Sequence, residues 1–280
     1  FHEKVFIDLS HEKLDLLGFH GQTIFHNAEE KISKQLGDGK LLSKLTKKNV
    51  VYNFRENDLK NGGQGAPLAP IFHKLLVDNK KIDLPVTILN IGGIANITSV
   101  QEGNKIYSSD IGPGNCLIDK WIRLNSDKKY DKNGSIAKTG KINKIILDQS
   151  LENFYASDIS KKRSYDIKDF DLSFVKGLSL EDGAATLTEF TASILSTKKI
   201  DNKVYICGGG RKNLFLLESI GKKISSEIKL IDDLEIDGDF IESQAFAYLA
   251  IRSYLRLPIS FPETTGANKA CNGGIIAEPK

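Results

Sequence analysis

Strand-forming runs that end in glycine-rich turns occur three times in this chain, and they constrain the fold more than any other feature of the sequence. The first has two strand-forming runs, 86–89 and 94–98, on either side of a Gly-Gly pair. The second brings Asp110 to a Gly-Pro-Gly turn that opens a helix. The third, 204–210, ends in three glycines and is again followed by a helix. Strands that alternate with helices are typical of an α/β protein.

The same turns suggest a chemistry. Bare glycines let backbone N–H groups approach an anion closely, and the helix that starts after Gly114 adds oriented N–H groups and a positive dipole. This combination is typical of a site that holds phosphate beside an acid. Either turn alone has a simpler interpretation as an ordinary turn. The third glycine-rich turn favours the phosphate-binding interpretation.

The composition is that of an ordinary globular chain. Its 280 residues, of which 40% are hydrophobic and 27% charged, suffice for two domains. The net charge of +3 is spread along the chain and does not indicate a nucleic-acid or membrane partner. No apolar run is long enough to span a membrane, and the first residues lack a signal-peptide pattern. Three widely spaced cysteines, Cys116, Cys207 and Cys271, favour a reduced, cytoplasmic setting.

Further elements follow from the pattern of apolar residues. Two short strands are expected before His20 and Arg55, at 14–19 and 50–54. The Lys-rich, polar segment 126–164 is expected to be exposed surface. Helices are expected at 70–77, 116–124, 179–196, 213–220 and 240–255.

The resemblance to one family is specific. The chain resembles the anhydro-N-acetylmuramic acid kinases of the sugar kinase/actin-like superfamily, from Leu14 to near its end. The combination of HGQT, GGQGAP and GPGN in this order makes the resemblance specific, since each motif alone is weak. The strings that carry it are GFHGQTIFH, NFREND, GGQGAPLAP, LNIGGIANIT, DIGPGNCLIDKW, YDKNG, ATLTEFTA, VYICGGGRKN, IESQAFAYLAIR and TTGA.

The resemblance implies a fold and a reaction. The fold is the two-domain actin-like (ribonuclease H-like) ATPase fold with a central cleft. We expect residues 1–60, with 262–280 returning to them, to form the sugar-kinase domain. Residues 61–261 would form the second domain, with the nucleotide and the catalytic base. The reaction is ATP-dependent opening of the 1,6-anhydro bridge by water with phosphorylation of the 6-hydroxyl, which gives N-acetylmuramic acid 6-phosphate in peptidoglycan recycling.

Asp110 is the expected catalytic base. Water that attacks the anomeric carbon needs a base, and a carboxylate at a strand end before a turn can face a cleft. In similar enzymes the Asp of this motif is that base, so the resemblance implies the same role for Asp110. The alternative interpretation is an Asp that caps the turn.

Several polar residues are expected at the sugar. The resemblance implies sugar contacts for His20, Gln22 and Thr23, which follow a strand end; loop hydrogen bonding is the alternative. Arg55 can clamp the lactyl carboxylate of muramic acid, or form a surface salt bridge. Glu242 is expected at the sugar or in proton transfer, unless it lies on a solvated helix face. Asp119, which shares a helix face with Asn115, completes the expected substrate set.

ATP and Mg²⁺ are the expected cofactors, because phosphoryl transfer depends on positioning and charge neutralisation. Metal binding by His20 and His26 is disfavoured, because no third ligand follows them. The expected partners are the sugar and ATP, without nucleic acid or membrane, and a homodimer is compatible with this set. Phosphate is assigned to Gly92, Gly93, Asn96, Gly112 and Gly114, and the adenosine and ribose to Gly208, Gly209 and Gly210.

The sequence departs from the family pattern in two respects. The SGTSxDG motif of the first phosphate hairpin is absent, the chain starts at Phe1, and it contains no Met. We therefore expect an N-terminal portion to precede it. Asn53 stands where the family usually has Asp, and Asn90 where many actin-like proteins have Asp. The change at Asn53 is expected to weaken or retune the sugar site.

Two other functions stay open from the sequence. One is an actin-like kinase for another sugar or acid, and the other is a non-catalytic nucleotide-binding regulator, which the missing hairpin permits. An NAD-dependent dehydrogenase is disfavoured, because no G-x-G-x-x-G follows a strand with an acidic residue about twenty positions on.

Overall fold

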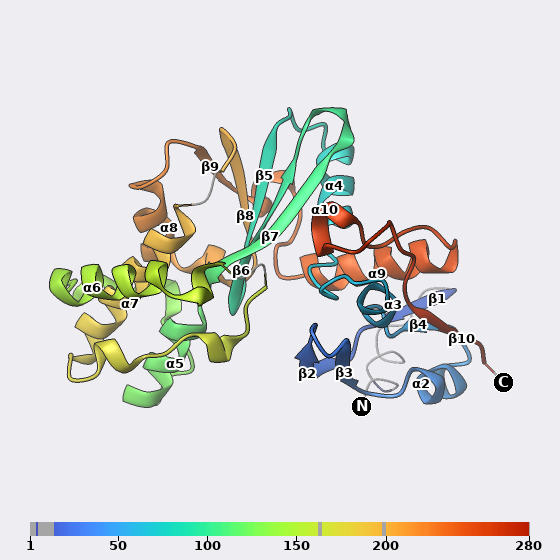
Figure 1. Cartoon of the computed structure of the whole chain (residues 1–280), viewed down its shortest axis with the longest axis horizontal. Coiled ribbons are helices and arrows are strands. Elements are labelled where there is room, and N and C mark those ends of the chain that lie inside the picture. Colours follow the sequence, from blue (N-terminus) through green and yellow to red (C-terminus); the bar gives the residue numbers. More distant parts are fainter. Residues whose placement is uncertain (1–3, 5–13, 162–163, 198–199, 280) are drawn as a thin grey trace. The chain divides into compact units, whose positions relative to one another are not determined.

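The computed structural model describes residue 4 and residues 14–161, 164–197 and 200–279. The chain divides into two compact units (Figure 1). The first comprises Phe1–Asn79, Ile106–Ser108 and Glu242–Lys280, and the second Lys80–Lys105 and Ser109–Ile241. Within the described residues, no helix is long and apolar enough to cross a membrane.

The first unit is built on a three-stranded sheet in the order β1-β4-β10. Strand β1 (Leu16–Phe19) is parallel to β4 (Asn49–Tyr52), and β10 (Ile275–Ala277) is antiparallel to β4. Strands β2 (Gln22–Asn27) and β3 (Ile32–Leu36) form a separate antiparallel hairpin. The helices of this unit are α2 (Gly39–Thr46), α3 (Glu56–Lys60), α4 (Pro70–Asn79), α9 (Ile241–Tyr254, from Glu242 on) and α10 (Pro262–Thr265).

The boundary between the units differs from the expected one. Residues 61–79 and 242–261, assigned from the sequence to the second domain, pack in the first unit. Apolar side chains cause this: Leu68 lies before α4 and Leu249 on α9, and both are buried with Val51 of β4. The rings of Phe72 and Tyr248 also meet, with their centroids 6.0 Å apart.

The second unit contains a five-stranded sheet in the order β7-β6-β5-β8-β9. Strands β5 (Val86–Ile91) and β6 (Ile94–Val100) form an antiparallel hairpin around Gly92 and Gly93. Strand β8 (Lys203–Cys207) is parallel to both β5 and β9 (Glu227–Leu230). Strand β7 spans Ile106–Pro113 and carries Asp110.

The described part of the second unit also contains α-helices (Figure 1). They are α5 (Cys116–Asn125), α6 (Lys144–Ala156), α7 (Leu180–Leu195) and α8 (Leu214–Gly221). Buried residues of α7 and α8 form one apolar core with β5 and β8. Buried residues of α5, α6 and α7 form a second core.

The segment 126–164 is more structured than the sequence suggested. It contains α6, and its residues Ile136, Leu147 and Phe154 belong to the second core. Its lysines between 128 and 144 are exposed, so the average polarity of the segment hid the buried positions. The α/β class and the presence of two units are confirmed.

Candidate active site

Asp110 has the environment of a base that works near neutral pH. One carboxylate oxygen accepts a hydrogen bond from the backbone N–H of Tyr165 at 2.9 Å. Ser164 provides a second, side-chain hydrogen bond. Burial nevertheless raises the pKa of Asp110 to about 6, because removal from water disfavours the charged form more than these two donors favour it.

The hairpin turn at Gly92 and Gly93 is fastened to the start of α5. The N–H of Gly114 donates to the Gly93 carbonyl at 2.9 Å, and that of Asn115 to the Gly92 carbonyl at 2.8 Å. A Cβ on Gly114 would lie 2.2 Å from the Gly92 oxygen. The close backbone approach that Gly114 permits is therefore to the hairpin, and its N–H is already used there.

The expected phosphate and nucleotide glycines fall into two groups. At Gly114, as described above, and at three others a side chain would collide with neighbouring atoms: a Cβ would lie 2.5 Å from Ile194 at Gly112, 2.4 Å from Asn90 at Gly208 and 2.3 Å from Ile91 at Gly210. These glycines are required by packing.

The glycines of the second group have space around them for a side chain. A Cβ would come no nearer than 3.4 Å to another atom at Gly92, 3.6 Å at Gly93 and 4.0 Å at Gly209. None of these three has a positive φ, so packing and backbone conformation do not explain why glycine stands there. Close approach of a ligand to the backbone is one physical use of glycine at such positions.

Three asparagines connect these turns. Asn90, near the end of β5, pairs with Asn96 of β6 and with Cys207 of β8 in the strand register. The side-chain amide of Asn115 lies 3.5 Å from the Ile91 carbonyl and is the atom nearest to the open face of Gly209. The ends of β5 and β8 and the start of α5 thus lie close together.

In the first unit His20 and Arg55 form a pair. The Nε and Nη2 groups of Arg55 donate to Nε2 of His20 at 3.1 and 3.0 Å, and Nη1 donates to the Gly65 carbonyl at 2.7 Å. His20 Nδ1 lies 2.8 Å from the Gly21 carbonyl. A neutral ring with its proton on Nδ1 satisfies all of these contacts.

Burial, which has the larger effect, and the charge of Arg55 together lower the pKa of His20 to about 4. The ring of Phe246 covers the imidazole, with a centroid distance of 4.2 Å. Burial also lowers the pKa of Arg55, while Glu242 and Asp58 raise it by their charges. The expected residues Arg55, His20 and Glu242 thus belong to one electrostatic group.

A cavity of about 330 Å³ opens beside His20 within this unit. Its polar lining includes His20, Asn53, Lys34 and Gln35, and Tyr52 adds an aromatic wall. Asn53 has a φ of 57°, a left-handed conformation that Asn tolerates better than most residues. The side-chain amide of Asn53 donates a hydrogen bond to the carboxylate of Glu56, which an ionised Asp could not do.

Three expected sugar residues lie elsewhere. Gln22 and Thr23 are exposed on β2 and, among the described residues, are not part of this cavity's lining. The Thr23 hydroxyl accepts a hydrogen bond from Gln35 across the hairpin at 3.2 Å. Asp119 lies on α5 of the second unit, where burial raises its pKa.

Sequence reasoning missed Asp58 and Lys34. Asp58 is 1% exposed and accepts hydrogen bonds from the Gly65 N–H and the Thr265 hydroxyl, both at 2.6 Å. It therefore holds the GGQGAP loop that carries the carbonyl partner of Arg55. Lys34 was missed because nothing in its local sequence marks it; the β2–β3 pairing brings it to the cavity.

Comparison with known proteins identifies the family. The family model for anhydro-N-acetylmuramic acid kinase matches residues 4–279. The anhydro-N-acetylmuramic acid kinase of Pelagibacter ubique is 59% identical over 278 residues, which are 95% of this chain and 74% of that protein. The enzyme of the same name from Zymomonas mobilis is 38% identical over 274 residues, 96% of this chain and 74% of that protein.

Solved structures similar to the chain include the activator of the 2-hydroxyisocaproyl-CoA dehydratase from Clostridium difficile with bound ADPNP. It has a TM-score of 0.40 at 16% identity and covers 64% of this chain and 63% of its own. The xylulose kinase of Rhodospirillum rubrum has a TM-score of 0.41 at 10% identity, with 78% and 48% covered. On the evidence of the family model and these sequence relatives, the chain belongs to the anhydro-N-acetylmuramic acid kinase family.

Proposed function

We propose that this chain uses ATP to open 1,6-anhydro-N-acetylmuramic acid with water and to phosphorylate it to N-acetylmuramic acid 6-phosphate, a step of peptidoglycan recycling. Membership of the family supports the kinase activity and the substrate. The observation that carries the chemistry is the half-buried carboxylate of Asp110, whose pKa of about 6 suits a base at neutral pH. A step that consumes ATP and a chain whose three cysteines are free fit the cytoplasm.

In the proposed reaction Asp110 removes a proton from the attacking water. The water oxygen forms a bond to the anomeric carbon, and the bond from that carbon to O6 breaks. O6 leaves with the electron pair and attacks the γ-phosphorus of ATP, and ADP departs. A carboxylate is a suitable base because a group with a pKa near the working pH combines availability with proton affinity.

For the nucleotide we propose that Gly92 and Gly93 approach the phosphates and Gly209 the adenosine side, because these three glycines have no packing reason. Asn96 adds a polar side chain on β6. Gly112, Gly114, Gly208 and Gly210 shape the same turns without direct contact.

Mg²⁺ is proposed to arrive with ATP. In the described part of the chain, no group of three or more His, Cys, Asp or Glu could hold a metal alone. Mg²⁺ usually takes one or two carboxylates and completes its shell with phosphates and water, so a site with few acidic residues fits it. When bound, it would neutralise phosphate charge.

For the sugar we propose the cavity of the first unit, with the neutral ring of His20 in its wall. Arg55 holds His20 in its tautomer, and the exposed Lys34 supplies a cation for the lactyl carboxylate. Glu242 is proposed near Arg55, because its charge raises the pKa of that guanidinium. Gln22, Thr23 and Asp119 stay proposed sugar contacts outside the cavity lining.

The test follows the product. The full-length gene product, given ATP, the anhydro sugar and labelled water, should yield a sugar 6-phosphate with one labelled oxygen at the anomeric position. Asp110→Asn should abolish most of this product, while Asp148→Asn, an exposed carboxylate on α6, should leave it unchanged. Phosphorylation of another sugar, but not of this one, would favour a different actin-like kinase. ATP binding without transfer would favour a regulator.

A further inference from the structure

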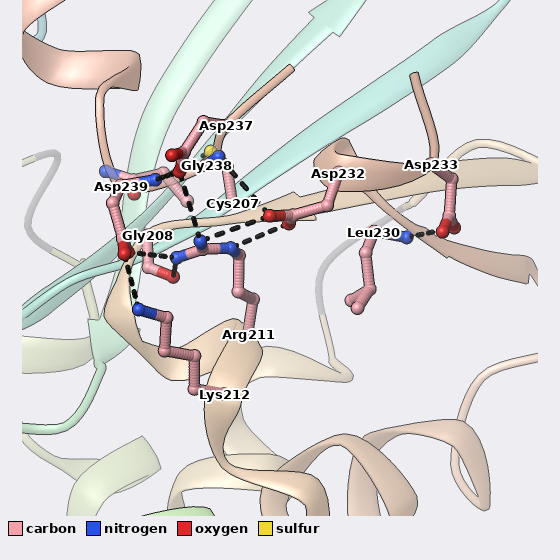
Figure 2. A network of polar contacts seen from close by, with 11 residues as sticks. Cys207, Gly208, Arg211, Lys212, Leu230, Asp232, Asp233, Asp237, Gly238 and Asp239 are labelled. Atoms are coloured by element: carbon pink, nitrogen blue, oxygen red, sulfur yellow. Dashed lines mark hydrogen bonds and ion pairs between the residues drawn. The ribbon is translucent and has the colours of Figure 1, made fainter. Parts of the chain in front are cut away.

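Arg211 follows the three glycines of the third turn and lies almost entirely inside the protein. Its side chain is 5% exposed. Nε and Nη2 donate hydrogen bonds to the carboxylate of Asp232 at 2.7 and 3.2 Å, and Nη1 donates one to Asp239 at 2.8 Å. Figure 2 shows the guanidinium between the carboxylates of Asp232 and Asp239. A carboxylate oxygen of Asp237 lies 3.9 Å from Nη2.

The same guanidinium also holds the glycine turn. Its Nη1 donates to the Gly208 carbonyl at 3.2 Å, and the backbone N–H of Arg211 donates to the same oxygen, also at 3.2 Å (Figure 2). Gly208 has a φ of 78°, so the turn is formed by a backbone conformation that few residues adopt. The arginine thus ties this unusual turn to residues 232–239.

The charges show that the cluster does not bind phosphate directly. Arg211 and Lys212 face the three carboxylates of Asp232, Asp237 and Asp239, so the group has a net negative charge. The hydrogen bonds from Arg211 to Asp232 have the largest effect on the pKa of Arg211 and raise it, so the guanidinium stays charged. A cation already neutralised by carboxylates has little attraction left for an anion.

Close packing reinforces the connection. A Cβ on Gly238 would lie 2.3 Å from Nε of Arg211, so the backbone of Gly238 lies directly on the guanidinium. The Gly238 N–H also approaches Asp232, at 3.4 Å (Figure 2). Any displacement of this segment therefore moves the arginine, and with it the Gly208 carbonyl.

We propose that Arg211 is a positioning residue for nucleotide binding: it fixes the Gly208 carbonyl and so the backbone that Gly209 presents to the adenosine side of ATP. This inference rests on the proposed function. The planar fork of arginine binds Asp232 through two nitrogens while the third reaches Asp239 and the Gly208 carbonyl, and the compact ammonium of lysine lacks this bidentate geometry.

The test compares two neighbouring cations by calorimetry with ATP and, separately, with the anhydro sugar. Arg211→Met should raise the Kd for ATP about tenfold or more and leave the Kd for the sugar unchanged. Lys212→Met removes the exposed cation next to it and should change neither affinity. A merely structural role would lower the melting temperature of Arg211→Met without changing ATP affinity well below that temperature.

Two further variants decide the matter if Arg211→Met does not fold. Asp232→Asn keeps the shape and removes one charge, and Gly238→Ala keeps every charge and displaces the segment; each should weaken ATP binding selectively. Wild-type ATP affinity in folded Arg211→Met, or in both of these variants, would overturn the role of Arg211 alone. A wild-type protein that binds the sugar but no ATP would overturn the proposed function and this inference together.

Discussion

The carboxylate of Asp110 on β7 accepts the backbone N–H of Tyr165, a residue 55 positions later in the chain, at 2.9 Å. This hydrogen bond stabilises the ionised form, and burial opposes it with the larger effect. The outcome is a carboxyl group whose pKa of about 6 lies just below neutrality. Both the rate and the stability of the protein should therefore depend on the protonation of Asp110.

The first prediction concerns rate against pH. As a general base Asp110 must be ionised, so kcat should be constant above its pKa of about 6 and fall about tenfold per pH unit below it. Asp110→Asn should lower kcat by about 10² or more at neutral pH, while ATP and sugar still bind. Stopped-time assays of sugar phosphate in the full-length gene product measure both effects. Near-wild-type turnover of Asp110→Asn would remove this residue from the mechanism.

The second prediction concerns stability. The pKa of Asp110 is higher in the folded protein than its ordinary value of 3.8, so its contribution to stability is full below pH 3.8 and is lost as pH rises through about 6. Above that pH, folding has to keep a charge buried. Asp110→Asn should then unfold with a free energy larger by roughly 1–3 kcal/mol at about pH 8, and the gain should vanish toward about pH 4.

Urea unfolding at several pH values measures this difference. Asp148→Asn, on the exposed face of α6, serves as the control and should show no such pH-dependent gain. Replacement of a catalytic base often stabilises the protein, because function and stability compete at an active site. If Asp110→Asn were less stable than the wild type at every pH, the carboxylate would have a structural role instead.

Much of the fold could be predicted because its strands and helices have strong local signals. Residues 86–98 gave both strands of the β5–β6 hairpin, and the helix expected at 116–124 is α5, Cys116–Asn125. The hairpin β2–β3 was not predicted as such, because exposed strands with mixed residues have no clear alternation. The boundary between the units expected from the sequence differs from that of the structure, because it depends on which core Leu68 and Leu249 join. The local pattern of apolar and polar residues does not contain that information.

The candidate site was predictable in composition but not in role. The sequence marked Gly208, Gly209 and Gly210 equally, and only the surrounding atoms separate them: two would collide with β5 and one faces open space. Likewise, the sequence suggested that Arg55 binds the lactyl carboxylate of the sugar. In the structure its guanidinium donates hydrogen bonds to His20 and to the Gly65 carbonyl. Distances between segments far apart in the sequence decide such roles.

The third prediction concerns the difference between Gly209 and Gly210. Gly209→Val should fold normally, since a Cβ there meets nothing nearer than 4.0 Å, and should weaken ATP binding about tenfold or more. Gly210→Ala should instead lose stability, by about 1–3 kcal/mol, because its Cβ would press on Ile91. Gly221→Ala at the end of α8, where a Cβ has 3.6 Å of room, is the control for both. Unchanged ATP affinity in folded Gly209→Val contradicts the assignment.

The last prediction concerns His20. Its pKa of about 4 means that it stays neutral through the physiological range, and the donors on Arg55 require the proton on Nδ1. Nitrogen chemical shifts should show this tautomer, without titration between about pH 5 and pH 8. Because an unfolded His20 would take up a proton near its ordinary pKa of 6.5, stability from this residue should fall as pH drops from 6.5 to about 4.

Arg55→Gln tests the cause. Removing the guanidinium charge, the second-largest cause of the shift, should raise the pKa of His20 toward 6.5 and weaken sugar binding through a mixture of ring tautomers. Arg252→Gln is the matched control, since this arginine also lies in the first unit and donates to the Pro258 carbonyl instead. A wild-type His20 that titrates near 6.5, or that carries its proton on Nε2, would show that Arg55 does not set its state. Sugar affinity unchanged in Arg55→Gln would separate the histidine tautomer from recognition, because the ring would then have changed state without any effect on the ligand.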